Sequence, residues 1–597
     1  MSHTYTAVGW NPQKRRYDRT LLLCVVAALA VFGGISFARN PDTTAETLLI
    51  RSLGFTAFAL LHVILSIGPL CRLDPRFLPL LYNRRHMGVT MFVLALGHGT
   101  LSFVLYHTLG VVSPIASLFG GDSGWTGFAG IPFQPLGAFA LAILFVMAAT
   151  SHDFWLRNLT APVWKALHMS VYVAYGLLVL HTALGYLQSD TGPTAAIVVS
   201  LGALWLVGLH LVAARRELRL DAATGTRADG DWIDVGAVAE IPENGARTVT
   251  VAGDRVAVFR YDGRISAVSS ICKHQNGPLG EGRIQDGCIV CPWHGYQYRP
   301  EDGCAPSPFT EKLPTFAVRV QHGRALVAAE PLPAGTRVEP ARIDGDGVLD
   351  SRDFYVGYGA PPTPRQSRFT TRAVAMATGI CLLALALVAS TQRSLANSRF
   401  EFGIERTFTG KVELLPYPVL RVTRPGGGAS VWMLVAQGKH GAEDLVRAHA
   451  GRAIRLRGSL VHQGEQTMIE VAPDSVVPLD AATSSLVPPP AIERLGRMTL
   501  RGEIVDSKCH LGVMNPGERR THRACAKLCI RGGIPPMLWV EDEAGAVRRL
   551  LLVALDGTAV NEQVVDLVGD PVEVTGDVTR LDDILLLKVD PATIRRL

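Results

Sequence analysis

The sequence predicts a multidomain membrane protein with an α-helical transmembrane bundle, an all-β domain in the middle of the chain, and C-terminal all-β tandem barrels of the OB type. Three observations lead to this fold class. The 597 residues are 48% hydrophobic, and the mean hydropathy of +0.23 is typical of a membrane protein with large soluble parts. Apolar runs of bilayer-spanning length are concentrated before residue 215. Later in the chain, short β-rich runs are bounded by Gly and Pro.

Six apolar runs follow a basic N-terminal segment of residues 1–19. We interpret the first run as a retained helix, because further spans follow it instead of a cleavage site and a soluble domain. Each run approaches the roughly 20 residues that a helix needs to cross a bilayer. The runs lie at about 21–38, 48–70, 87–109, 136–150, 167–187 and 195–214 and form a predicted domain over residues 20–215.

The charges of the loops predict how these helices are oriented. Basic residues cluster before the first helix, between the second and third, between the fourth and fifth, and after the sixth, whereas the opposite loops hold a single Arg39. By the positive-inside rule, the N-terminus and the segment after the sixth helix are cytoplasmic. We therefore expect a multi-pass protein of the cell inner membrane. The net charge of +6 is small for this length and argues against nucleic-acid binding.

Two short motifs after the six helices combine cysteine with histidine. Cys272-Lys273-His274 is followed, sixteen residues later, by Cys291-Pro292-Trp293-His294. Two thiolates and two imidazoles suit a 2Fe-2S cluster in which cysteines bind one iron and histidines bind the other. A zinc site with the same ligand types is the alternative. The flanking Gly277-Pro278 and Tyr296-Gln297-Tyr298 favour the iron–sulfur interpretation.

This arrangement resembles the Rieske family over about residues 231–329. The resemblance implies an all-β domain at 225–335. Its implied metal ligands are Cys272, His274, Cys291 and His294. Gly277 and Trp293 stand where the Rieske proteins of respiratory cytochrome bc complexes carry a bracing disulfide, so the resemblance is to the ferredoxin and oxygenase type. A Rieske oxygenase also needs an iron site of two histidines and one carboxylate, and the sequence after residue 330 offers none.

Histidines within the predicted spans indicate a cofactor, because ionisable residues are costly in a bilayer. The third helix carries His86 and His98, and the fifth carries His168 and His181. At 1.5 Å per residue, each pair is separated by about 18–19 Å, so the two helices place one histidine each at two matching depths. This pattern suits one or two b haems. Residues twelve apart differ by about 120° around an ideal helix, so His86 does not share a face with His98.

The same helices resemble the ferric-reductase-like transmembrane family, which includes the haem subunit of the periplasmic methionine sulfoxide reductase system. The resemblance covers about residues 48–214 and rests on Gly68-Pro69-Leu70, Arg84-Arg85-x-Met87-Gly88 and Trp164-Lys165-x-x-His168. The haem ligands that it implies are His86, His98, His168 and His181. For a lone histidine we expect a hydrogen-bonded packing role, as at His62, His107 and His210.

The last third of the chain begins with a predicted linker at 336–370. An apolar run with arginines before it then predicts a seventh helix at 371–392, which would place everything after it on the periplasmic side. Two sets of short β-rich runs follow, and in each set the last strand comes about ten residues after a glycine, Gly458 or Gly576. This repeat predicts two OB-like barrels, at 400–480 and 495–597.

The second copy of the repeat contains an insertion with Cys509, His522, Cys525 and Cys529. If residues 521–530 are helical, the last three fall at i, i+3 and i+7 on one face. A disulfide and a metal or redox cofactor are both open interpretations of these residues. Cys525 and Cys529 are poorly placed to bridge each other within a straight helix, so Cys509 is the expected partner in any disulfide.

Together these features predict transmembrane electron transfer from a cytoplasmic reductase or ferredoxin, through a 2Fe-2S cluster and haem b, to an acceptor on the outer face. The sequence lacks the glycine-rich fingerprint of a nucleotide-binding domain after the last helix of the bundle. The chain is therefore expected to be an oxidoreductase component of the ferric-reductase-like kind without its own flavin or nicotinamide domain. The alternative is a membrane-anchored metal or haem assembly protein, or a redox-sensing scaffold. The lipid bilayer is a partner in both cases.

Overall fold

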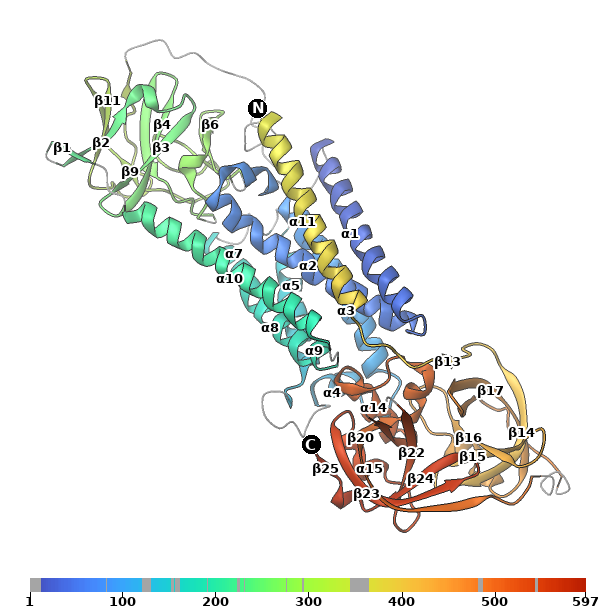
Figure 1. Cartoon of the computed structure of the whole chain (residues 1–597). Helices are drawn as coiled ribbons and strands as arrows, with labels where there is room; N and C mark the ends of the chain where they lie inside the picture. Colours follow the sequence, from blue (N-terminus) through green and yellow to red (C-terminus); the bar gives the residue numbers. More distant parts are fainter. Residues whose placement is uncertain are drawn as a thin grey trace.

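The computed structural model describes residues 12–81, 83–120, 130–151, 155, 161–189, 192–222, 226–229, 231–274, 276–292, 295–343, 364–480, 487–542 and 546–597. The long helices form a bundle, with a β domain of residues 226–343 at one end and two β-barrels of residues 398–597 at the other (Figure 1). We call these the middle β domain, the first barrel and the second barrel. The helices are α1 (Pro12–Arg39), α2 (Ala45–Leu73), η1 (Pro75–Leu81), α3 (Arg84–His107), α4 (Pro114–Gly120), α5 (Phe133–Ala149), α7 (Ala161–Met169), α8 (Val171–Leu184), α9 (Tyr186–Ser189), α10 (Pro193–Ala222) and α11 (Pro364–Ser390).

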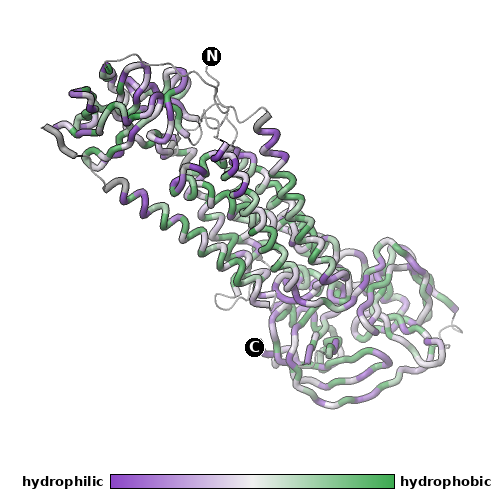
Figure 2. The backbone as a smooth tube through the Cα atoms, turned by 45° about the horizontal axis from the view of Figure 1, so that its top comes forward, coloured by the Kyte–Doolittle hydropathy of each residue, from purple (hydrophilic) through white to green (hydrophobic). Residues whose placement is uncertain are grey.

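The bundle has the composition of a membrane domain. Six candidate spans among the described residues are long and apolar enough to cross a bilayer, and α5 is a shorter apolar helix of 17 residues. Leu204, Val207 and Leu211 of α10 are each more than half exposed, an arrangement that indicates contact with lipid. Figure 2 shows hydrophobic residues along the helices and hydrophilic ones toward the two ends of the molecule. The chain is a multi-pass membrane protein.

One of the predicted spans differs from a single straight helix. The predicted fifth helix is divided into α7, α8 and α9, with breaks at Ser170 and Gly185. The seventh helix, α11, packs alongside α1 (Figure 1), and Cys24 Sγ lies 3.5 Å from Thr378 Oγ1 where the two meet. The chain thus crosses the bundle once more after the middle β domain and reaches the barrels at the opposite end.

The middle β domain consists of two sheets, with strand orders β1-β2-β11-β10 and β12-β5-β4-β3, and a small sheet β6-β7-β8. Buried side chains of the first two sheets form one core, which includes Ile233, Val256 and Val327. β12 lies within the predicted linker and pairs with β5, so this domain extends beyond residue 335. The strands are β1 (Thr226–Asp229), β2 (Trp232–Ala237), β3 (Gly245–Val251), β4 (Asp254–Tyr261), β5 (Arg264–Ser269), β6 (Arg283–Gln285), β7 (Cys288–Val290), β8 (Gln297–Tyr298), β9 (Thr315–Phe316), β10 (Val318–Gln321), β11 (Arg324–Ala328) and β12 (Ala341–Arg342).

The C-terminal sheets confirm the prediction of tandem OB-like barrels. In the first barrel the order β17-β14-β15-β16-β18 closes through a β17–β18 pairing, and only β16 and β18 of this ring are parallel. The first barrel contains β13 (Ser398–Phe400), β14 (Arg406–Leu414), β15 (Pro418–Thr423), β16 (Ala429–Val435), α12 (Glu443–Val446), β17 (Ala453–Gln463), β18 (Gln466–Val471) and β19 (Val477–Pro478).

The second barrel repeats this topology with a β20–β23 closure and a parallel β22–β24 pair. Gly458 and Gly576 lie where the fourth strand of each barrel passes close to the fifth, and a Cβ there would overlap the carbonyls of Glu470 and Lys588. The second barrel contains β20 (Ile492–Asp506), η6 (Cys509–Val513), α14 (Arg519–Arg531), β21 (Pro536–Glu541), β22 (Val547–Ala554), α15 (Asn561–Val564), β23 (Pro571–Leu581), β24 (Ile584–Val589) and β25 (Arg595–Arg596).

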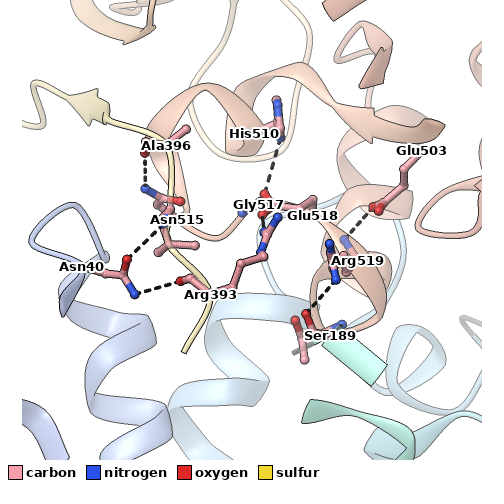
Figure 3. A network of polar contacts seen from close by, with 12 residues as sticks. Asn40, Ser189, Arg393, Ala396, Glu503, His510, Asn515, Gly517, Glu518 and Arg519 are labelled. Atoms are coloured by element: carbon pink, nitrogen blue, oxygen red, sulfur yellow. Dashed lines mark hydrogen bonds and ion pairs between the residues drawn. The ribbon is translucent and has the colours of Figure 1, made fainter. Parts of the chain in front are cut away.

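The insertion of the second barrel, which comprises η6 and α14, docks against the ends of the helices. Arg519 Nη1 donates to the carbonyl of Ser189 at 3.2 Å (Figure 3). The segment that follows α11 is also held there, because Asn40 Nδ2 donates to the carbonyl of Arg393 at 3.0 Å. Asn515 Nδ2 reaches the carbonyl of Asp42 at 3.1 Å. These polar contacts tie the insertion to the loops after α1 and α9, so the barrel is fixed against the bundle.

Candidate functional site

The two cysteine–histidine motifs lie on loops at one tip of the middle β domain. Cys272 follows β5, and its amide donates to the carbonyl of Gly277 at 3.0 Å. Cys291 follows β7, and its amide donates to the carbonyl of Tyr296 at 2.8 Å. Cys272, His274 and Cys291 are all buried, with at most 1% of each exposed. His294, the fourth predicted ligand, lies outside the described residues.

The surroundings of these loops suit an iron–sulfur cluster. Burial, with the charge of Arg85, lowers the pKa of His274 to about 3, so its imidazole is neutral and able to bind a metal. The hydroxyl of Tyr298 lies 3.6 Å from Cys272 Sγ and accepts a hydrogen bond from the Lys273 amide at 3.0 Å. Burial raises the pKa of Tyr298, so the hydroxyl keeps its proton. A hydroxyl beside a ligand sulfur raises the potential of a cluster when it donates to that sulfur.

Three aromatic rings connect the middle β domain with the helix bundle. The His274 ring is stacked on Trp164 of α7, with ring centroids 5.1 Å apart and an interplanar angle of 28°. Trp164 is stacked in turn on His168, at 3.6 Å and 22°. The Trp164 indole is itself held by a hydrogen bond from Nε1 to the carbonyl of Thr150, at 3.0 Å. A predicted cluster ligand and a predicted haem ligand are therefore separated by one aromatic side chain.

At the other end of the bundle, His98 of α3 and His181 of α8 face each other. Their ring centroids are 6.2 Å apart. Two imidazoles on opposite faces of one haem iron have centroids about 6 Å apart, because each metal–nitrogen bond is about 2 Å long. His98 Nδ1 donates to the carbonyl of Ile50, and His181 Nδ1 donates to that of Phe133, each at 2.8 Å. Each ring therefore has its lone pair on Nε2. The two histidines could thus both bind the iron of one haem.

A cavity of about 350 Å³ lies at the end of the bundle nearest the middle β domain. His168 lines it, and the Nε2 atom of this histidine is buried without a hydrogen-bond partner among the described residues. His168 Nδ1 bonds the carbonyl of Trp164 at 3.0 Å. Arginines from α2 and α3 also line the cavity, namely Arg72, Arg84 and Arg85. A free imidazole nitrogen beside guanidinium groups suits a haem with its anionic propionates.

His86 does not join this cavity in the described part of the chain. Its Nδ1 lies 2.9 Å from the carboxylate of Asp18 on α1, and the residues that line the cavity from α3 are Arg84, Arg85, Gly88 and Met91. The structure thus brings together His98 and His181 but does not pair His86 with His168. This agrees with the helical angle, which turns His86 away from the face of His98.

Three further histidines in the bundle have hydrogen-bond partners on their ring nitrogens. His62 bonds the carbonyl of Phe58 and the hydroxyl of Tyr175. The partners of His210 are Leu206 and Tyr172, and His107 bonds Ser117. These contacts agree with the packing role expected for them.

Two family models match the chain, a Rieske [2Fe-2S] domain over residues 231–317 and a ferric reductase like transmembrane component over residues 52–179. The chain is 32% identical over 117 residues to the ferredoxin component of the alkene monooxygenase system of Xanthobacter autotrophicus, which covers 19% of this chain and 96% of that protein. It is 37% identical over 92 residues to the 3-phenylpropionate/cinnamic acid dioxygenase ferredoxin subunit of Photorhabdus laumondii, covering 15% of this chain and 87% of that protein.

The chain belongs to the Rieske family, with its Rieske domain fused to a ferric reductase-like transmembrane domain. Among solved structures, a chain of the complex of reduced oxygenase and oxidized ferredoxin in carbazole 1,9a-dioxygenase is 31% identical, with a TM-score of 0.17. The match covers 17% of this chain and 98% of that chain. The family model and the relatives identify the middle β domain as a Rieske domain, and this domain supports a 2Fe-2S cluster. Together with the membrane domain, it supports a role in membrane electron transfer.

The second barrel holds the remaining predicted site residues in one buried cluster. Cys509 comes from η6, whereas His522, Cys525 and Cys529 lie on one face of α14. All four are buried, and the three cysteines are free. Asp506 joins them, because its Oδ2 lies 2.7 Å from His522 Nε2. The structure thus brings all four predicted residues together.

The pKa values of the three cysteines in this cluster shift in different directions. Hydrogen bonds from the thiols of Cys509 and Cys529 lower the pKa of Cys525. Hydrogen bonds with Cys525 and Cys529, together with burial, raise the pKa of Cys509. Burial raises the pKa of Cys529. Burial opposes protonation of His522, but the nearby Cys525 and Asp506 outweigh it and raise the pKa of His522 to about 9. These contacts favour the thiolate form of Cys525 and the protonated form of His522.

Sequence reasoning missed several residues that complete these sites. Trp164 belongs to a family motif in the sequence, but the motif by itself predicts no role for it. Sequence reasoning did not identify Gly54 and Gly137, whose missing side chains leave room for the rings of His98 and His181, or Asp506 beside His522. The spacing Trp164-x-x-x-His168 was a usable signal, because residues four apart share one face of a helix.

Proposed function

We propose that this chain transfers single electrons across the membrane, from a reductase or ferredoxin at the Rieske domain to an acceptor at the side of the barrels. In this proposal the Rieske domain is cytoplasmic and the barrels are periplasmic, in the inner membrane. The 2Fe-2S cluster and haem b supply the one-electron redox centres when bound. The protein supplies their ligands, their burial and their spacing. The basic residues near the Rieske end of the bundle support this orientation.

The observation that carries the proposal is the stack of His274, Trp164 and His168. It joins the two domain types through ring-to-ring contacts of 5.1 and 3.6 Å. All three rings lie at the interface between the Rieske domain and the bundle, where Trp164 is 3% exposed. Such an arrangement holds two redox centres close together in a fixed relation, and a short distance favours rapid electron transfer.

For the membrane part of the path we propose two haem sites. His98 and His181 would hold one haem near the barrels. His168 would hold the other in the cavity that Arg72, Arg84 and Arg85 line. His168 and His181 are thirteen residues apart, which corresponds to about 19 Å along a helix. Gly54 and Gly137 support the site near the barrels, because their missing side chains leave room for the rings of His98 and His181.

We expect Trp164→Leu to slow transmembrane electron transfer about tenfold, equivalent to about 1.4 kcal/mol in the barrier, because it removes the ring between His274 and His168. The full-length protein is placed in liposomes that contain ferricyanide, and dithionite is added outside. The rate of ferricyanide reduction inside reports transfer. The Rieske electron paramagnetic resonance signal and the haem spectrum should stay at parental values, which separates loss of the path from loss of a centre.

Trp205→Leu is the matched control. Trp205 is also a bundle tryptophan, on α10, but its indole bonds Ser66 and its side chain is half exposed. We expect this variant to transfer electrons at the parental rate. Equal rates in the parent and in Trp164→Leu, with both centres present, would rule out the stacked path. No reduction inside parental liposomes would rule out the transmembrane role itself.

A further inference from the structure

The cysteine cluster of the second barrel has the geometry of a metal site. Cys509, His522 and Cys525 present ligand atoms that all lie within 4.8 Å of one another, and Asp506, Cys509 and Cys529 form a second such group. Cys509 belongs to both groups, so its sulfur lies within 4.8 Å of a ligand atom of each of the other members, His522, Cys525, Asp506 and Cys529. Three thiolates with one imidazole form a donor set that binds thiophilic metals.

Burial favours a closed metal site over thiol exchange with another protein. Cys509, Cys525 and Cys529 are 4%, 1% and 0% exposed. They belong to a core that also includes residues of both barrels, with Leu105 and Tyr106 of α3 packed against it. Cysteines that exchange disulfides with partners are partly exposed. A structural metal site needs no such access.

The imidazole of His522 is held in the orientation of a metal ligand. Its Nε2 lies 2.7 Å from Asp506 Oδ2, and a carboxylate in this position fixes the ring and its tautomer in many metal sites. The other nitrogen, Nδ1, lies 3.0 Å from the sulfur of Met514. Asp506 also accepts a hydrogen bond from the Cys509 amide at 2.8 Å, so one carboxylate orients two of the proposed ligands.

A disulfide explains the cluster less completely. Cys525 and Cys529 are four residues apart in α14, where their Cβ vectors run nearly parallel. A bridge from Cys509 to either one would leave the third thiol, His522 and Asp506 without a function. A single metal ion uses all three sulfurs and the imidazole.

We propose that Cys509, Cys525, Cys529 and His522 Nδ1 bind one thiophilic metal ion, either Zn²⁺ or Cu⁺. The site goes beyond the proposed electron transfer and does not depend on it.

The proposed metal site lies close to α3. Cys525 Sγ lies 3.9 Å from the carbonyl of Leu105, which is seven residues beyond His98 on α3, or about 10 Å along the helix. Copper at this position would extend the electron path beyond the outer histidine pair. Zinc would hold the two parts of the insertion, η6 and α14, together.

Metal analysis of the full-length protein, purified without a metal-binding tag, tests this proposal. We expect about one equivalent of zinc or copper per chain in addition to iron. The metal that is found shows whether the site binds Zn²⁺ or Cu⁺. Cys525→Ser should lose this metal. Cys288→Ser and Cys304→Ser, which change cysteines of the Rieske domain outside its motifs, should keep it. The Rieske signal and the haem spectrum should be unchanged in Cys525→Ser, so failure here is distinct from failure of the proposed function.

Reconstitution keeps the test valid if Cys525→Ser does not fold. Parental protein is stripped with a chelator under reducing conditions and titrated with Zn²⁺ or Cu⁺, and the thiolate-to-metal absorbance should saturate near one equivalent. Two results would overturn the proposal. One is a lack of zinc and copper uptake by the reduced protein. The other is purified protein that carries neither metal and shows, by mass spectrometry, a disulfide between two of the three cysteines.

Discussion

Among single residues, two buried glutamates of the second barrel have pKa values that move in opposite directions. Burial, with the nearby Glu518, raises the pKa of Glu503 to about 7. Burial acts on Glu518 in the same sense, but His510 and Arg393 outweigh it and lower its pKa to about 2. Figure 3 shows the Glu518 carboxylate between these two basic side chains. Glu518 is thus ionised at neutral pH, whereas Glu503 titrates there.

The raised pKa of Glu503 predicts how the stability of the barrel depends on pH. The pKa of Glu503 rises from 4.5 to about 7 on folding. Its favourable contribution to the free energy of unfolding is therefore complete below about pH 4.5 and is lost as the pH rises through about 7. Glu503→Gln keeps the oxygen that accepts from the Arg519 amide at 2.6 Å but cannot ionise. We expect this variant to be more stable than the parent by up to about 3 kcal/mol at about pH 8.

The midpoint of thermal unfolding of the full-length protein in detergent, measured between about pH 5 and about pH 8, checks this effect. The gain should shrink as the pH falls. Glu493→Gln, at an exposed position of the same strand, serves as the control and should change the midpoint little. A constant difference between Glu503→Gln and the parent across this range would contradict the assignment.

At the scale of helices, α2 and α5 support the outer histidine pair in the same way. Ile50 of α2 offers its carbonyl to His98, and Gly54 one turn later leaves room for that ring. Phe133 and Gly137 of α5 do the same for His181. A Cβ at Gly54 or Gly137 would lie 2.8 or 2.7 Å from the Nδ1 atom of the histidine. Each helix therefore positions a ligand through one carbonyl and one missing side chain.

We expect Gly54→Ala and Gly137→Ala each to remove most of one haem equivalent, because the added methyl group pushes the imidazole from its position. Alanine favours a helix by about 1 kcal/mol over glycine, so a loss of haem would not come from a weaker helix. Haem is measured per chain from the reduced-minus-oxidised spectrum of purified protein. Gly176→Ala and Gly208→Ala are matched controls, since a Cβ at these helical positions meets no atom within 4 Å. Full haem content in Gly54→Ala and Gly137→Ala would show that the pair tolerates displacement or does not bind haem.

At the scale of the whole molecule, the Rieske domain and the barrels lie at opposite ends of the bundle (Figure 1). α11 makes this possible, because it carries the chain from one end to the other along α1. The apolar surfaces of the helices separate two regions that are both rich in polar residues (Figure 2). With the helices in a bilayer, the Rieske domain and the barrels would therefore lie on opposite sides of the membrane.

Labelling with a membrane-impermeant maleimide tests this topology and its direction. Glu465→Cys lies at the exposed turn between β17 and β18 of the first barrel, and Asp254→Cys lies at the exposed turn between β3 and β4 of the Rieske domain. We expect the first to be labelled in intact spheroplasts and the second only after lysis, both above the level of the parent. The reverse pattern would place the Rieske domain outside and reverse the proposed flow of electrons.

Sequence alone determined the features that depend on local spacing. The ligand types in the two Rieske motifs, the apolar runs and the glycine-bounded β-rich runs of the barrels each lie within short segments, so their pattern can be read without a structure. Tertiary structure decided which distant side chains meet. The contacts of Trp164 with His274, of His98 with His181, and of Asp506 with His522 depend on the depth and rotation of whole elements. Packing sets these quantities, and helical periodicity alone cannot, which is why matched depth paired His98 with His181 but did not bring His86 to His168.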